Sequence, residues 1–165
     1  MIFRNLTMAG FKSFAEKVEI DIDPGLTGIV GPNGCGKSNI VEAMRWIMGE
    51  SSARQMRGTE MDDIIFAGTE NRPARNLAEI LLKLDNSNRT APADFNNADE
   101  LEIIRKVQRG KGSSYLINGR PARAKDVQLL FADTASGARS AGIVSQGRIG
   151  AIVGAKPEDR RSLIE

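Results

Sequence analysis

Eight residues near the start of the chain have the types and spacing needed to bind a chain of phosphates. They run Gly31-Pro32-Asn33-Gly34-Cys35-Gly36-Lys37-Ser38 and fit the pattern G-x-x-x-x-G-K-[ST] without a mismatch. We expect its three glycines to take positive φ angles, which let backbone N–H groups approach phosphate oxygens closely. Lys37 would supply positive charge to the β- and γ-phosphates, and the Ser38 hydroxyl would bind Mg²⁺. The pattern predicts a site for a nucleoside triphosphate.

The flanking sequence predicts the elements that would hold this loop. A short apolar stretch over 26–30 indicates a buried strand that runs into the loop. A helix is predicted over about 37–48, ending at Gly49, because apolar residues recur at three- and four-residue spacing: Ile40, Val41, Met44, Ile47 and Met48. The N-terminus of that helix would direct its N–H groups and its dipole at the phosphates. The alternative is a glycine-rich turn without a ligand.

The rest of the chain predicts more strands than helices. Val18, Ile20 and Ile22 alternate with acidic residues, which indicates a strand with one solvated face. The order of elements favours an α/β fold with a mixed sheet and a β-hairpin lobe. The predicted strands cover 2–9, 17–22, 77–85 (with Ile80, Leu82 and Leu84 on one face), 100–108, 113–118 and 143–145; the other segments are irregular residues over 50–76, an exposed loop over 86–99, a tight turn over 109–112, and a helix over 124–132 with Val127, Leu130 and Phe131 on one side.

The composition of the chain limits the class of protein and the kinds of catalysis that it can carry out. The chain has 165 residues, 41% of them hydrophobic and 27% charged, which is enough for one domain with a moderate core. The net charge of +2 does not by itself indicate a nucleic-acid partner. There is no histidine and one cysteine, so imidazole catalysis and an internal disulfide are excluded. The sequence shows no membrane-spanning run or signal peptide, which favours a cytoplasmic protein.

Five segments resemble the structural maintenance of chromosomes (SMC) proteins, most of all the bacterial condensin type. They are Phe11-Lys12-Ser13-Phe14, the loop with its following Asn39, and the segments 57–66, 117–120 and 133–149. The resemblance implies a P-loop NTPase fold of the ABC-ATPase head type, of which residues 1–165 would be the N-terminal half. Because residues 157–165 look like the first turns of a helix, we expect a coiled coil from about residue 160 onward, beyond this chain.

The resemblance also implies what this half lacks. The sequence has no apolar strand ending in Asp-Glu and no Ser-Gly-Gly signature, which in the family come from the C-terminal half of the head. We therefore expect the chain alone to be an inactive or very weak ATPase. The implied partners are that C-terminal half, a second SMC head in a homodimer, kleisin and accessory subunits, and double-stranded DNA bound without sequence specificity. The implied role is chromosome condensation and segregation at the nucleoid, through ATP-driven head engagement.

Several site residues are expected from this resemblance rather than from the loop pattern. Gln146 matches the glutamine-loop residue, which binds Mg²⁺ or positions the attacking water, and Arg57 matches a basic residue that reaches the phosphates in cis. The alternatives without a function are that Gln146 is a polar residue in a turn and that Arg57 is a surface arginine. The complete set of expected nucleotide contacts is Lys12, Ser13, Pro32, Asn33, Gly34, Cys35, Gly36, Lys37, Ser38, Asn39 and Arg57, with Lys37 and Gln146 as catalytic residues and Ser38 and Gln146 as Mg²⁺ ligands.

Basic residues of the predicted hairpin and the turn after it form a candidate DNA surface. Contacts with the phosphate backbone would be independent of sequence and strongly dependent on salt. The alternative is a solvated strand face. The residues are Arg105, Lys106, Arg109, Lys111, Arg120 and Arg123.

The sequence is also compatible with two other functions. RecF and RecN proteins share the phosphate loop, so the chain could belong to a DNA-repair ATPase of that kind. It could also be a nucleotide-binding switch module that does not hydrolyse ATP.

Overall fold

Six strands form one antiparallel sheet in the part of the chain that the computed structural model describes, residues 1–50 and 61–132. The sheet order is β2-β1-β3-β4-β5-β6. The strands are β1 (Ile2–Ala9), β2 (Val18–Asp21), β3 (Leu77–Asp85), β4 (Glu100–Gln108), β5 (Gly112–Ile117) and β6 (Arg120–Ala122). The helices are α1 (Lys37–Ile47) and α2 (Ala124–Ala132), with short 3₁₀ turns η2 (Met61–Ile64) and η3 (Ala93–Phe95).

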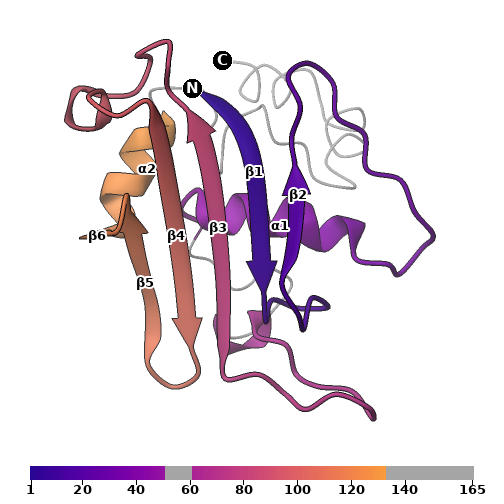
Figure 1. Cartoon of the computed structure of the whole chain (residues 1–165). Helices are drawn as coiled ribbons and strands as arrows, with labels where there is room; N and C mark the ends of the chain where they lie inside the picture. Colours follow the sequence, from indigo (N-terminus) through magenta and orange to yellow (C-terminus); the bar gives the residue numbers. More distant parts are fainter. Residues whose placement is uncertain (51–60, 133–165) are drawn as a thin grey trace, which may run out of the picture.

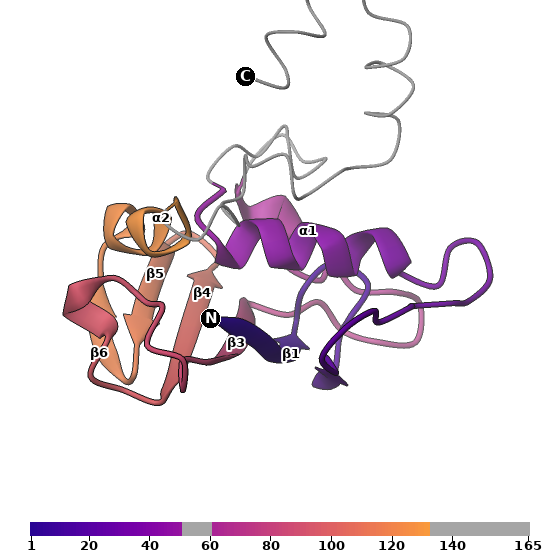
Figure 2. The same cartoon turned by 90° about the horizontal axis from the view of Figure 1, so that it is seen from above.

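Both α-helices lie on the same face of the sheet, behind the strands in Figure 1 and on one side of them in Figure 2. Alternation along the strands explains this arrangement, because every second residue points to the helix side. The predicted stripe of Ile80, Leu82 and Leu84 on β3 is confirmed and is at most 2% exposed. Leu82 pairs with Leu6 of β1 and Ile103 of β4, so the stripe continues across the sheet.

Helix α1 is fixed by the apolar residues of its C-terminal half. Trp46 and Ile47 are fully buried, and the Trp46 ring lies 5.8 Å from the Phe11 ring. Helix α2 buries the predicted set of Val127, Leu130 and Phe131. Neither these two helices nor any other helix in the described ranges is long and apolar enough to cross a membrane.

The sheet differs from the predicted mixed sheet. All five strand pairings in the described residues are antiparallel, so the α/β expectation holds only for the presence of helices against a sheet. Strand β6 was not predicted, because three residues containing Pro121 give no alternating signal.

The predicted buried strand over 26–30 is wrong for the described structure. These residues have no regular secondary structure, and Leu26 and Val30 are 100% and 93% exposed. No strand in the described part lies beside them to complete a ladder, and an apolar run without a neighbouring strand has nowhere to place its backbone hydrogen bonds. The segment instead leads to the phosphate loop as exposed chain.

Candidate functional site: the phosphate loop

The phosphate loop lies at the N-terminal end of α1. Gly36 precedes the helix in a left-handed conformation with φ +99°, and Gly34 has φ +84°. The expectation of positive φ is therefore confirmed at these two glycines, but Gly31 does not have a positive φ. A Cβ atom on Gly31 would nevertheless come within 2.8 Å of the Cys35 sulfur, so this position also favours glycine.

Residues just after β1 pack against the end of the loop. A Cβ atom on Gly36 would lie 2.9 Å from Ser13 Oγ and 3.1 Å from Phe14 Cζ. Asn39 Nδ2 donates a hydrogen bond to the same Ser13 oxygen at 2.8 Å. Ser13 and Asn39, both predicted to contact nucleotide, are thus brought together beside the loop.

The loop presents donors that could serve an anion. In the described part of the chain, the backbone N–H groups of residues 34–38 and the Ser38 hydroxyl have no hydrogen-bond acceptor. The Lys37 ammonium donates to the carbonyl oxygens of Gly31 and Pro32, at 2.5 Å each. These carbonyls are exposed and can exchange the lysine for water. The loop therefore concentrates available N–H groups and one positive charge at a helix N-terminus.

Lys12 is held by a partner that the sequence analysis did not identify. Its ammonium forms an ion pair with the Glu42 carboxylate, and both side chains are largely buried. Glu42 lies one helical turn after Ser38, so the ion pair holds the Lys12 ammonium beside the first turns of α1. In the structure, Glu42 shares the buried face of α1 with Ala43, Trp46 and Ile47.

Cys35 is exposed and lies inside the loop. Its sulfur is 3.8 Å from the Lys37 ammonium nitrogen.

Two predicted residues, Arg57 and Gln146, lie outside the described residues. The described ranges contain no group of three or more acidic, histidine or cysteine side chains that could hold a metal by themselves. Ser38 fits the part of one oxygen ligand to Mg²⁺, a cation that usually takes few protein ligands beside phosphate oxygens and water.

The structure corrects one member of the candidate DNA surface. Arg105 is only 3% exposed, so its guanidinium cannot contact a phosphate backbone from this position. It donates hydrogen bonds to the carbonyl oxygens of Trp46 and Glu50 at 2.6 Å each. The sequence contained the signal, because Arg105 has the same parity along β4 as the buried residues Ile103 and Val107.

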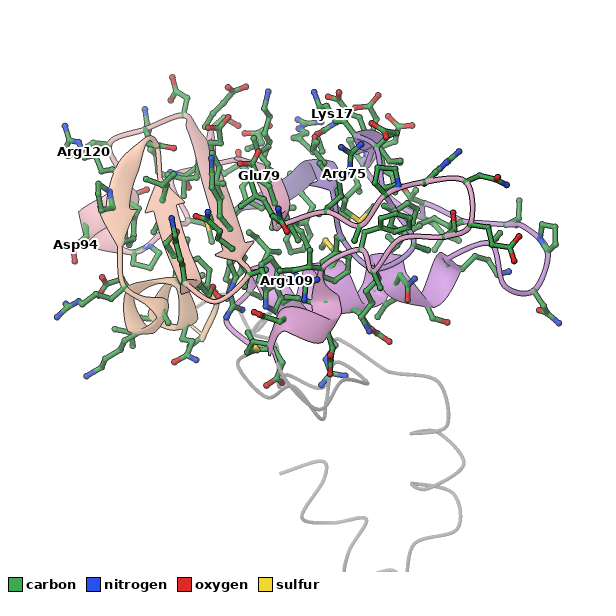
Figure 3. All side chains as sticks on the ribbon, turned by 90° about the horizontal axis from the view of Figure 1, so that it is seen from below. Lys17, Arg75, Glu79, Asp94, Arg109 and Arg120 are labelled. Atoms are coloured by element: carbon green, nitrogen blue, oxygen red, sulfur yellow. The ribbon has the colours of Figure 1, made fainter. Side chains whose placement is uncertain are left out.

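The remaining basic residues do not form one patch. Arg109 and Lys111 lie in the turn between β4 and β5. Arg120 lies opposite Ile117 at the other end of β5, and Arg123 lies between β6 and α2. Figure 3 shows Arg109 and Arg120 well apart. Arg123 is paired with Asp126 at 3.1 Å, and hydrogen bonds between the two lower the pKa of the Asp126 carboxyl. Lys106 pairs with Glu79 at 2.6 Å on the sheet face opposite the helices.

Comparison with known proteins places this site in a family. Residues 2–137 match the family described as RecF/RecN/SMC N terminal domain. The chain is 60% identical over 165 residues to the chromosome partition protein Smc of Rhodopseudomonas palustris, covering all of this chain and 14% of that protein. The chain thus spans about one seventh of the length of this curated relative.

Solved structures agree with this match. A structure from work on ATP-driven dimerization and DNA stimulated activation of SMC ATPases superposes with a TM-score of 0.90 at 36% identity, covering 99% of this chain and 98% of that one. An Smc head bound to the C-winged helix domain of ScpA gives a TM-score of 0.89 at 37% identity, with 99% of this chain and 50% of that chain covered. The phosphate loop, the antiparallel sheet and these matches agree with one another. The chain therefore belongs to the RecF/RecN/SMC N-terminal domain family, as the N-terminal portion of an SMC head.

Proposed function

We propose that this chain is the nucleotide-binding part of the ATPase head of a bacterial chromosome partition protein, with ATP and Mg²⁺ as cofactors. The observation that carries the proposal is the loop at the start of α1, where the N–H groups of residues 34–38 have no acceptor in the described part of the chain and Lys37 and Ser38 begin the helix. The strong similarity to curated Smc proteins supports the same function.

The loop residues would act mainly by binding and orienting the triphosphate. The N–H groups of the loop would donate to phosphate oxygens, and the α1 dipole would favour their negative charge. Lys37 would exchange the Gly31 and Pro32 carbonyls for the β- and γ-phosphates. Bound Mg²⁺ would neutralise charge on the phosphates, and Ser38 would hold it.

Four further residues would complete the site. Ser13, which accepts the Asn39 hydrogen bond, would meet the α-phosphate or the ribose together with Lys12. Gln146 would bind Mg²⁺ or position the attacking water, and Arg57 would reach the phosphates in cis. These four assignments follow from the family resemblance of the segments that contain them.

Hydrolysis would require partners. The C-terminal half of the same head would bring the catalytic acid and the signature motif, and a second head would close over the nucleotide in a homodimer. Kleisin and accessory subunits would join the intact protein, which we place in the cytoplasm, associated with the nucleoid. A relative of this chain is named for binding the C-winged helix domain of ScpA, which supports a kleisin partner.

DNA would be bound through exposed basic side chains without sequence specificity. Arg109 and Lys111 would form one contact region and Arg120 and Arg123 another, each binding backbone phosphates. A repair role like that of RecF or RecN is disfavoured by the 60% identity to a chromosome partition protein. A switch without hydrolysis would describe this chain alone and not the complete head.

Binding of a fluorescent ATP analogue with Mg²⁺ tests the proposal, first in the intact head and then in this chain. Lys37→Ala removes a charge-assisted hydrogen bond of about 1.5–3 kcal/mol, so we expect affinity to fall roughly tenfold to a hundredfold. The matched control is Lys17→Ala, an exposed lysine paired with Glu19 at 3.5 Å, away from the loop. Equal affinities for all three proteins would contradict the proposal.

A further inference from the structure

The C-terminal end of α1 is tied to the hairpin by a set of buried hydrogen bonds. Arg105 Nη1 on β4 donates to the carbonyl oxygens of both Trp46 and Glu50, at 2.6 Å each. Tyr115 on β5 donates its hydroxyl to the same Trp46 oxygen at 3.2 Å. The Gly49 N–H also donates to the Trp46 oxygen at 3.2 Å. The two side chains therefore add to the backbone capping of α1 and tie its C-terminal end, with Glu50 just beyond it, to the hairpin.

Stacking makes the attachment specific for arginine. The Arg105 guanidinium carbon lies 4.3 Å from the centre of the Trp46 ring and 4.7 Å from that of the Tyr115 ring. Its Nε donates to Ser113 Oγ on β5 at 3.0 Å. A planar guanidinium can stack on aromatic rings and donate in several directions at once, which a lysine ammonium cannot do.

The two ends of α1 serve different parts of the molecule. The N-terminal end carries Lys37 and Ser38 of the phosphate loop, and an eleven-residue helix places them roughly 16 Å from the other end. The other end is bound to Arg105, four residues before Arg109 in the exposed turn of the hairpin. The hairpin and the loop are therefore joined through one rigid element.

We propose that Arg105 is a positioning residue that couples the β4–β5 hairpin to the phosphate loop through α1. This inference rests on the proposed ATPase function and names the route by which DNA at the hairpin would change ATP turnover. A displacement of the hairpin would pull on the Trp46 and Glu50 carbonyls, and α1 would carry the displacement to Lys37 and Ser38. Without the guanidinium, hairpin and helix would respond separately.

Steady-state ATP turnover of the intact protein, with and without double-stranded DNA, tests this coupling. We expect Arg105→Gln to retain ATP affinity and DNA-free turnover within about threefold while losing most of the stimulation by DNA, since site-to-site coupling is typically a five- to 150-fold effect. The matched control is Lys83→Gln, which removes an exposed positive charge from β3 of the same sheet and should keep the stimulation. Hydrogen exchange gives an independent readout: DNA should change the protection of residues 46–50 in the wild type and not in Arg105→Gln.

The remaining outcomes distinguish failure of this coupling from failure of the proposed ATPase function. Wild-type stimulation in folded Arg105→Gln, or an equal loss of DNA-free and stimulated turnover, overturns the inference. Absence of ATP turnover in the wild-type protein instead overturns the proposed function. If Arg105→Gln does not fold, Ser113→Ala decides, because it removes only the hydrogen bond from Arg105 Nε to β5. Reduced stimulation in Ser113→Ala supports the inference, and unchanged stimulation overturns it.

Discussion

At the residue scale, the conformation of the phosphate loop explains why particular residues occupy it. Gly36 has a φ that other residues adopt at a cost, and Ser13 and Phe14 leave no room for a side chain. Lys37 and Ser38 follow at the positions where a helix N-terminus already favours negative charge. The loop pattern predicted these roles, but it did not predict the Lys12–Glu42 ion pair, which joins two segments thirty residues apart.

Gly36→Ala should destabilise the chain and weaken nucleotide binding. The positive φ costs a residue with a side chain about 1–2 kcal/mol, and the contact with Ser13 Oγ at 2.9 Å adds to this. Gly25→Ala is the matched control, because Gly25 has φ +96° but open space around its Cβ position. Urea denaturation should give a larger loss for Gly36→Ala than for Gly25→Ala, and equal losses would show that the packing against Ser13 and Phe14 is wrong.

At the scale of elements, alternation and helical spacing predicted most of the fold. The bounds of β1, β3, β4 and α2 match their predicted ranges, because each has a clear period of its own. The pairing of the strands could not be predicted from these periods, because the antiparallel order and the short β6 depend on contacts between strands. The segment over 26–30 shows the limit, since an apolar run becomes a strand only where a neighbour accepts its hydrogen bonds.

The ion pair between Arg4 on β1 and Asp85 on β3 predicts that the stability of the fold depends on pH. The Asp85 carboxylate on β3 accepts a hydrogen bond from the Ser87 N–H at 2.8 Å and another from Arg4 Nη2 on β1 at 2.5 Å. Hydrogen bonds from Ser87 and then from Arg4 hold the pKa of Asp85 well below its usual range. The folded state therefore binds fewer protons here than the unfolded state, so this contribution is present above about pH 4 and is lost as the pH falls further.

Comparison of the wild type with Asp85→Asn measures that contribution. The difference between their denaturation midpoints should be present at pH 6 and should shrink as the pH falls below about 4. Asp94→Asn, at an exposed carboxylate of η3, serves as the control and should follow the wild type more closely. A difference that stays constant from pH 6 to pH 2 would contradict the assigned role of Asp85.

At the scale of the whole molecule, the exposed apolar segment before the phosphate loop points to a covering partner. Leu26, Ile29 and Val30 are all exposed large hydrophobic residues within five positions, and Val41 of α1 is exposed as well. Clustered exposed apolar side chains commonly mark an interaction surface. The proposed C-terminal half of the head would cover this segment and provide neighbouring strands.

Val30→Asp should separate folding of this chain from its assembly. Val30 is 93% exposed, so the free energy of unfolding of the chain alone should change by less than about 0.5 kcal/mol. Association with the C-terminal half, measured by co-purification or calorimetry, should be strongly weakened because a charge would be buried there. Lys17→Asp, another exposed position, should leave association intact. Undiminished association of Val30→Asp would remove this segment from the interface.

We propose that this chain holds the triphosphate but lacks the group that completes hydrolysis. The most direct test is ATP turnover with Mg²⁺, measured for this chain alone, for the chain mixed with the C-terminal half of the head, and for the mixture with Lys37→Ala. We predict turnover only when both halves are present, and its loss in the Lys37→Ala mixture. Robust turnover by this chain alone, abolished by Lys37→Ala, would show that the catalytic acid lies within these 165 residues and would rule out the proposed division of the site between the two halves.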